Sequence, residues 1–447
     1  MTFSPTPPAA VLWIATTLEE AGFETWVVGG AIRDLLLGRS AGDWDLATRA
    51  TPQEIMSTFR RTVPIGVDHG TVGVLGRDQV LYEVTTFRRD VETDGRRAVV
   101  EFSDTIQEDL ARRDFTSNAI AWHPLRQELL DPSGGQAHLE ARVLEAVGVP
   151  AQRFAEDYLR VLRALRFSGH FGFAIEEETW GALCEAVPHL DNLSVERVQE
   201  ELMKVLSKAE TPSVALKLYQ RCGALQKLYP ELTDALAVSD PPSFEQVLAA
   251  CDAVPRTRPL VRMAILLSPM VGESSSSVNA VYDRVEKLLI RLRCSNAESK
   301  RVAKLVANRT FGAPSSESVD IRRWLVRTDP ALFPDLARIW LAEARVDINP
   351  TDMADGPAET SVVERIRSIR SVLTAKPPLS TAQLAVNGAD LQALGLIPGP
   401  VFGEILERLL EHVLLHPEAN TRSRLEEIIE DEDLAGEVRS GSKDDSR

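Results

Sequence analysis

Hydrophobic positions in the first forty residues alternate between helical and strand-like spacing. Residues 9–21 follow the 3.6-residue period of an amphipathic helix, which Gly22 closes. β-Branched and aromatic residues at 25–28 favour a strand. Residues 31–37 return to helical spacing and are followed by Gly38, a residue type common at helix C-termini. The pattern predicts a helix, a strand, a turn and a second helix.

The pattern then predicts further strands. Thr51 and Pro52 have the chemistry of a helix start, and residues 63–83 read as strands around turns. Residues 87–103 are rich in charged and turn residues, so we expect a mobile loop there, although charged surface loops without a role are common. Turn residues and Pro150 mark the end of this mixed region.

From about residue 151 the spacing is helical almost to the C-terminus. A chain of 447 residues with this change of pattern contains more than one domain. The last predicted helix ends at His416, and the others cover residues 154–167, 194–206, 211–228, 243–253, 260–267, 280–293, 297–308, 319–326, 331–347 and 359–373.

Composition narrows the class of protein. The chain has 44% hydrophobic and 26% charged residues, which is ordinary for a soluble globular protein. We find no signal peptide and no apolar run that could span a bilayer. The four cysteines are scattered and lack metal-ligand spacing. We therefore expect a cytoplasmic protein whose cysteines are reduced. A net charge of −16 argues against nucleic-acid binding over the whole surface, so a polyanion has to meet local basic patches.

Two features near the first strand point to nucleotide chemistry. Gly29 and Gly30 permit a turn that a ligand can approach closely, and Arg33 follows in the first helical turn, where a cation is easier to explain beside a phosphate. Asp43 and Asp45 leave one face of an expected strand together, as a Mg²⁺ site requires. Taken alone, the Asp pair is more often two solvated carboxylates.

Three further groups are candidates for the same site. Glu83, on an expected strand, is a possible third carboxylate, although a lone Glu in a strand is more often solvated. Arg112 and Arg113 can neutralise a triphosphate, and Asp114, close to the amide of Asn118, can accept from a ribose hydroxyl. A helix start with a local salt bridge is the simpler explanation of that segment.

The predicted helix at 154–167 has two distinct faces. Four apolar side chains share one face, namely Tyr158, Val161, Leu162 and Leu165. The opposite face contains Asp157, Arg160, Arg163 and Arg166. Such a row is either a solvated helix face or, in an acidic chain beside a nucleotide site, a nucleotide-binding face.

Together these segments resemble the class II tRNA nucleotidyltransferases, the family of CCA-adding enzymes and bacterial poly(A) polymerases. The resemblance covers residues 26–206 and returns in the Asn387-Gly388-Ala389-Asp390-Leu391 and Pro398-Gly399-Pro400 segments. It implies an α+β fold, in which a polymerase-β-like nucleotidyltransferase head with a mixed sheet precedes an all-helical remainder. The expected domains are the head at 1–150, a neck with the nucleotide-selecting helix at 151–210, a body at 211–318, a tRNA-binding tail at 319–436 and a disordered terminus at 437–447.

The resemblance also implies residue roles. The family's triphosphate-binding residues correspond to Gly29, Gly30 and Arg33. Asp43 and Asp45 correspond to the residues that bind two Mg²⁺ ions, and Glu83 to the third catalytic carboxylate. Arg113 and Asp114 correspond to the residues that contact phosphate and ribose. The amino-acid template that selects the base corresponds to Asp157 and Arg160, with Arg163 and Arg166 continuing its face and Arg197 and Glu200 in the motif that braces it. None of the seven histidines reads as a metal ligand.

Base selection by two side chains is physically reasonable. Cytosine and adenine both present an amino donor beside a ring-nitrogen acceptor, which matches the Asp157 carboxylate beside the Arg160 guanidinium. Uracil and guanine present the reverse order and leave polar groups unpaired, which is costly. A protein helix can therefore select C and A without a nucleic-acid template.

We expect CCA addition to the 3′ end of tRNA from CTP and ATP, with pyrophosphate released. Residues 87–103 include the Asp94-Gly95-Arg96-Arg97 segment that CC-adding relatives lack, which favours A addition, and the acidic C-terminus disfavours a poly(A) polymerase. A-only addition and a non-catalytic tRNA-binding protein are the alternatives. The expected partners are the acceptor and T arms of tRNA, with no membrane and no DNA.

Overall fold

The computed structural model describes residues 5–93, 98–238, 242–272, 277–309, 317–346 and 358–431. The chain divides into two compact units. The first unit contains Met1–Asp234, Pro255–Pro259 and Arg291–Cys294, and the second contains Ala235–Val254, Leu260–Ile290 and Ser295–Arg447. No helix among these residues is both long and apolar enough to cross a membrane.

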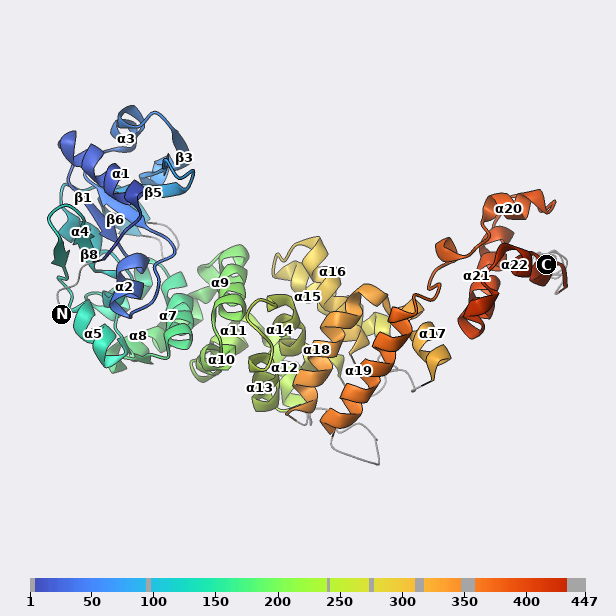
Figure 1. The fold of residues 1–447 in the computed structure, drawn as a ribbon. Helices are drawn as coiled ribbons and strands as arrows, with labels where there is room; N and C mark the ends of the chain where they lie inside the picture. The colour runs from blue at the N-terminus through green and yellow to red at the C-terminus, as the bar shows by residue number, and fades with distance from the viewer. Residues whose placement is uncertain are drawn as a thin grey trace, which may run out of the picture. The chain divides into compact units, whose positions relative to one another are not determined.

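A mixed seven-stranded sheet forms the centre of the N-terminal part (Figure 1). Its strand order is β3-β4-β5-β2-β1-β8-β9. The pairs are antiparallel except for β2 with β5, which is parallel. The strands are β1 (Thr25–Val28), β2 (Asp45–Thr48), β3 (Thr62–Gly66), β4 (Thr71–Leu75), β5 (Leu81–Thr86), β8 (Ala121–His123) and β9 (Glu128–Leu130). This arrangement confirms the predicted α+β head with a mixed sheet.

The two faces of the sheet have different roles. Helices α1 (Ala9–Glu20) and α3 (Pro52–Thr58) pack on one face, where Val72, Val74 and Val84 are buried. The opposite face is covered at β1 and β8 by a cluster that includes Trp26 and Leu110 of α4 (Ile106–Ala111). Because the register pairs Val28 with Asp45 and Ala47 with Thr85, Asp45 and Glu83 lie on this second face.

The segment at 87–103 is a β-hairpin and not the expected loop. Strands β6 (Arg88–Thr93) and β7 (Ala98–Phe102) pair antiparallel as a sheet of their own. The prediction gave too much weight to the charges of the first half and too little to Val99, Val100 and Phe102, which favour a strand. Residues 94–97 lie outside the described part of the chain.

The rest of the first unit is mainly helical. Gly223, at φ +83°, divides the predicted helix 211–228 into two. The helices are α2 (Gly30–Leu36), α5 (Gly135–Ala141), α6 (Pro150–Glu156), α7 (Leu159–Phe171), α8 (Glu177–Ala186), α9 (Val195–Lys208), α10 (Pro212–Arg221) and α11 (Ala224–Leu228), while α12 (Pro230–Val238) crosses into the second unit. Two short strands, β10 (Val143–Leu144) and β11 (Ala174–Ile175), pair in parallel.

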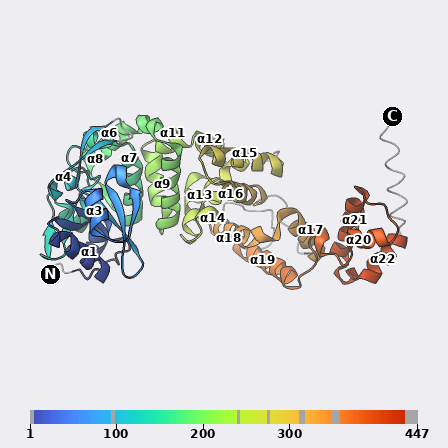
Figure 2. The same ribbon diagram turned by 90° about the horizontal axis from the view of Figure 1, so that it is seen from above.

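The described part of the second unit is helical (Figure 2). It contains α13 (Phe244–Asp252), α14 (Pro259–Leu266), α15 (Val278–Arg291), α16 (Asn296–Asn308), α17 (Ser318–Thr328), α18 (Phe333–Ala344), α19 (Ala358–Thr374), α20 (Gly388–Ala393), α21 (Val401–Leu415) and α22 (Arg422–Asp431). A separate apolar core near the C-terminus includes Leu391, Leu409 and Leu425. Sequence spacing alone missed α8, α12 and α22. The predicted domain boundaries remain a proposal.

Candidate active site

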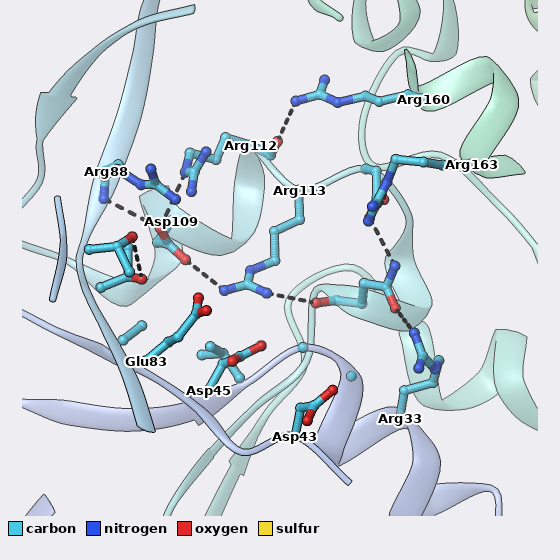
Figure 3. Close-up of a pocket in the computed structure, with 18 of the residues that line it drawn as sticks. Arg33, Asp43, Asp45, Glu83, Arg88, Asp109, Arg112, Arg113, Arg160 and Arg163 are labelled. Atoms are coloured by element: carbon cyan, nitrogen blue, oxygen red, sulfur yellow. Dashed lines mark hydrogen bonds and ion pairs between the residues drawn. The ribbon is translucent and has the colours of Figure 1, made fainter. Parts of the chain in front are cut away.

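A cleft of about 760 Å³ opens on the second face of the sheet (Figure 3). All of its lining residues belong to the first unit. The predicted residues that line it are Gly29, Gly30, Arg33, Asp43, Asp45, Glu83, Arg112, Arg113, Asp114, Asn118, Asp157, Arg160 and Arg163. Segments up to 169 residues apart in sequence, from Val28 to Arg197, therefore meet at one cavity.

The acidic side of the cleft contains three carboxylates. Strand β2 begins at Asp45, so Asp43 precedes the strand and does not share it as predicted. Both carboxylates nevertheless line the cleft (Figure 3). The pairing of Leu46 with Val84 sets Asp45 beside Glu83 on adjacent strands.

The surroundings of Asp45 favour a bound cation. Loss of water around its carboxyl group and the negative charges of Glu83 and Asp43 raise the pKa of Asp45 to about 6, although Arg113 opposes the shift. Within the described residues no three acidic, histidine or cysteine groups come close enough to hold a metal ion by themselves. Mg²⁺ commonly uses one or two carboxylates together with substrate phosphates and water, which is a donor set that this cleft can supply.

The glycine turn leaves space for an arginine. Gly29 has φ +72°, and a Cβ on it would lie 2.8 Å from Nη1 of Arg113. The Gly29 N–H donates to the Ile120 carbonyl, so it is already used in the protein. The backbone conformation therefore requires glycine here, and a side chain at this position would also displace the Arg113 guanidinium.

Asp109 orients the two arginines, a role that the sequence reading missed. Its side chain is 1% exposed, and it accepts from Nε of Arg112 at 3.2 Å and from Nη2 of Arg113 at 3.0 Å. The backbone N–H of Arg88, at the base of the β6–β7 hairpin, also donates to it. Burial alone would raise the pKa of Asp109, but Arg113 and Arg112 hold it below its usual value, so the carboxylate stays charged.

A continuous network joins α2 to α7. Arg33 donates from Nη1 to Oδ1 of Asn118 at 2.6 Å, and the Asn118 amide donates to Asp114 at 2.9 Å. Arg163 completes the network by donating from Nε to Asp114 at 2.8 Å. Burial would raise the pKa of Asp114, but Arg163 and Asn118 lower it to about 2. The network fixes Arg33 and Arg163 at one end of the cleft (Figure 3).

The predicted helix at 154–167 is interrupted at its most informative residue. Asp157 has extended backbone angles and separates α6 from α7. Its Oδ1 accepts from the Leu159 N–H at 3.1 Å, as a capping aspartate does, and its Oδ2 accepts from Arg197 at 2.7 Å. Asp157 is thus held from both sides while it lines the cleft. Asp is a common capping residue, and this signal in the sequence could have revealed the break.

Arg160 and Arg166 occupy different environments. Arg160 lines the cleft and donates to the backbone carbonyls of Arg153 at 2.8 Å and Arg112 at 3.0 Å. Arg166 does not line the cleft, in contrast to the predicted row, and its Nε donates to the buried Glu201 at 2.6 Å. Glu201, and not the exposed Glu200, therefore joins α9 to α7.

Comparison with known proteins agrees with this geometry. Three family models match the chain: "Poly A polymerase head domain" at residues 25–145, "Probable RNA and SrmB-binding site of polymerase A" at 172–236, and "tRNA nucleotidyltransferase domain 2 putative" at 275–429. The first model spans the glycine turn, the carboxylates Asp43, Asp45 and Glu83, and the Asp109–Asn118 segment. The fold and the cleft place the chain in the class of nucleotidyltransferases.

Relatives identify the family. A CCA-adding enzyme of Lactobacillus delbrueckii subsp. bulgaricus is 32% identical over 421 residues, which cover 92% of this chain and 95% of the relative. A CCA-adding enzyme of Geobacillus sp. is 46% identical over 202 residues, and there the chain spans half of the relative's length. The crystal structure of the Bacillus stearothermophilus CCA-adding enzyme in complex with CTP has a TM-score of 0.73 at 28% identity and covers 98% of this chain and 100% of that one. The chain belongs to the family of CCA-adding enzymes.

Proposed function

We propose that the protein is a template-independent tRNA nucleotidyltransferase that adds CCA to the 3′ end of tRNA from CTP and ATP and releases pyrophosphate. The observation that supports this most strongly is the convergence of three carboxylates, a set of anchored arginines and the Asp157/Arg160 pair on one cleft. The similarity to CCA-adding enzymes over almost the whole chain supports the same activity.

In this proposal the two sides of the cleft have different functions. Arg33, Arg113 and Arg163 bind the triphosphate, and their carboxylate and amide partners hold them in place before the substrate arrives. Arg112 adds positive charge, Asn118 connects Arg33 to Asp114, and the glycine turn gives the phosphates close access. The Asp114 carboxylate accepts from the ribose of the incoming nucleotide.

The three carboxylates act where the bond forms. Asp43 and Asp45 would hold two Mg²⁺ ions, and Glu83 would support Asp45 from the next strand. When bound, the ions lower the pKa of the RNA 3′-hydroxyl and stabilise the charge on the leaving pyrophosphate. Asp45 has to be ionised for this role, and a bound cation favours the ionised form.

Base selection falls to Asp157 and Arg160. Their side chains line the same cleft, and each is fixed by other groups of the protein, so their donor and acceptor positions are set in advance. A carboxylate beside a guanidinium matches the pairing edges of cytosine and adenine. Uracil and guanine leave these groups unpaired and are disfavoured.

We infer that tRNA is the acceptor and that the helical second unit binds it. A Thermotoga maritima CCA-adding enzyme complexed with tRNA shares the fold of this chain at a TM-score of 0.58 and 21% identity. The family model over residues 275–429 is likewise described as a tRNA nucleotidyltransferase domain. The acceptor and T arms are the parts of tRNA that we expect the protein to contact.

The test is an extension assay with Mg²⁺ and two tRNA transcripts, one lacking CCA and one ending in CC, supplied with CTP, ATP or both. Addition of C, C and A to the first transcript establishes the proposed activity. Extension of the CC-ended transcript alone, by one A, would identify an A-adding enzyme instead. Binding without extension of either transcript would leave a non-catalytic tRNA-binding protein.

A further inference from the structure

An exposed aliphatic surface continues the catalytic face of the sheet. Val63, Ile65 and Leu81, which we call the aliphatic platform, are 45%, 45% and 41% exposed. Gly73 lies between them, because a Cβ on Gly73 would lie 2.8 Å from Cδ1 of Ile65 and 3.0 Å from Cγ of Leu81. The missing side chain at Gly73 therefore leaves a shallow apolar surface formed by its neighbours.

The platform lies directly beside the catalytic carboxylates. The sheet places β2, β5, β4 and β3 side by side, and the register pairs Gly73 with Glu83 on one side and with Val63 on the other. Asp45, Glu83, Gly73 and Val63 thus form a row on one face. Leu81 lies on the same strand as Glu83, two residues away, and Val63 lies two strands away, at about 4.8 Å per strand.

The geometry of phosphoryl transfer assigns a direction to each substrate. Attacking and leaving oxygens lie roughly in line on opposite sides of the reacting phosphorus. Arg33 and Arg163, which bind the triphosphate in the proposed function, lie on the other side of Asp45 from Glu83 (Figure 3). The RNA 3′-hydroxyl therefore approaches from the side of Glu83, where the platform lies.

We propose that the aliphatic platform supports the 3′-terminal base of the growing RNA strand; this inference rests on the proposed function. A nucleobase can pack its face on an apolar surface without hydrogen bonds and therefore without a preference for sequence. Such tolerance is needed here, because the terminal base changes after each addition. The platform is uncharged and lies next to the Glu83 carboxylate, so it favours contact with a base over contact with a phosphate.

The experiment measures the first C addition to a tRNA transcript that lacks CCA. In Ile65→Ala/Leu81→Ala we expect the KM for tRNA to rise about tenfold, because the base loses part of the aliphatic area on which it packs, while the KM for CTP is unchanged. Ile65→Met/Leu81→Met keeps the apolar surface and should retain the normal KM for tRNA. Val80→Ala removes a neighbouring side chain that is 50% exposed and serves as the matched control.

A second RNA substrate distinguishes the loss of base packing from a general effect of the substitutions on RNA binding. A transcript with an abasic 3′-terminal residue should raise the KM for RNA about tenfold in the unaltered protein and cause no further rise in the double alanine variant. If the abasic residue and the double alanine substitution raise the KM for RNA independently, so that their effects multiply, the inference is overturned. An unchanged KM in the double alanine variant, or an equal rise in Val80→Ala, would also overturn it. If the unaltered protein extends no RNA at all, the proposed function itself fails.

Discussion

Arg163 in the first unit and Arg309 in the second unit both pair with a buried carboxylate, but their surroundings differ. Arg163 donates to Asp114 at 2.8 Å and lines the cleft. Arg309 donates from Nε to Glu343 at 2.7 Å and from Nη1 to the Ser268 carbonyl at 3.0 Å, and the two side chains of this pair are only 3% and 2% exposed. The first pair therefore presents charge to the cleft, whereas the charges of the second pair are neutralised by each other inside a helical core.

The same difference appears within one helix. Arg163 and Arg166 are three residues apart on α7, and helical spacing alone puts them on the same face. Arg163 faces the cleft, while Arg166 binds Glu201 of α9. A row of like charges is thus an unreliable guide to function until the partner of each charge is known. This contrast between charges that face a ligand and charges that hold helices together leads to five predictions.

The largest effect is expected at Asp45. Asp45→Asn removes one charge from the carboxylate side of the cleft and should lower kcat/KM for C addition by on the order of 10³-fold, as loss of a transition-state contact does. Steady-state kinetics on tRNA lacking CCA measures it. Asp68→Asn, an exposed change in the same sheet region, should leave kcat/KM unaltered. Near-normal activity of Asp45→Asn would contradict the assigned site.

Breaking the buried pair of the second unit should affect stability and not base selection. Arg309→Met leaves the Glu343 carboxylate buried without its guanidinium and should reduce the free energy of unfolding by about 3–5 kcal/mol. Chemical denaturation measures this change. Adding Glu343→Leu removes the buried charge, so the double variant should recover much of the loss. A changed preference among the four nucleotides in folded Arg309→Met would disprove the separation of roles.

The α7 comparison gives a matched pair of variants. Arg163→Met should raise the KM for CTP about tenfold, because it removes a charged contact to the nucleotide, and it should also lower the midpoint of thermal unfolding, because the buried Asp114 loses its charged partner. Arg166→Met should leave that KM unchanged and lower the midpoint of thermal unfolding, because Glu201 loses a charged partner. Similar KM values in both variants would show that Arg163 does not contact the nucleotide.

Asp109 combines features of both groups, because its buried carboxylate lines the cleft and accepts hydrogen bonds from two arginines of the cleft. Asp109→Asn should weaken triphosphate binding several-fold while base preference is retained, since the orientation of Arg112 and Arg113 depends on both oxygens of Asp109. Titration of the variant with CTP, ATP and inorganic pyrophosphate tests this expectation. Equal losses for all three ligands support a positioning role, and unaltered pyrophosphate binding argues against it.

The smallest expected effect is a pH dependence. Without a bound cation the pKa of Asp45 is about 6, and the proposed reaction needs its ionised form, so at limiting Mg²⁺ kcat/KM should rise with pH below about 6, and saturating Mg²⁺ should move this rise to lower pH. A single group gives at most a tenfold change per pH unit. Asp114, with a pKa of about 2, stays ionised throughout this range. A flat profile between pH 5 and 7 would show that Asp45 is already ionised when substrate binds.

Local patterns in the sequence predicted local structure well. The strand at 25–28 has the bounds expected, and the Thr51 side chain and Glu54 form the capping box of α3, so the predicted helix start at Thr51 and Pro52 is confirmed. The role of Glu201 and the contact of Asp157 with Arg197 were missed because their partners are distant in sequence. Asp109 lies only three and four residues from Arg112 and Arg113, but its burial, which makes it an anchor for both, depends on the tertiary fold. The β6–β7 hairpin was missed because charge obscured its strand-forming residues.

Nucleotide preference is the property that selection of the base by Asp157 and Arg160 should control. Relative kcat/KM values for CTP, ATP, UTP and GTP should be measured with the unaltered protein, Asp157→Ala and Arg160→Ala. The unaltered protein should favour CTP and ATP by at least about 10³-fold, and each variant should lose most of that preference while it still binds triphosphate. Unchanged preference in both variants would contradict selection by these side chains.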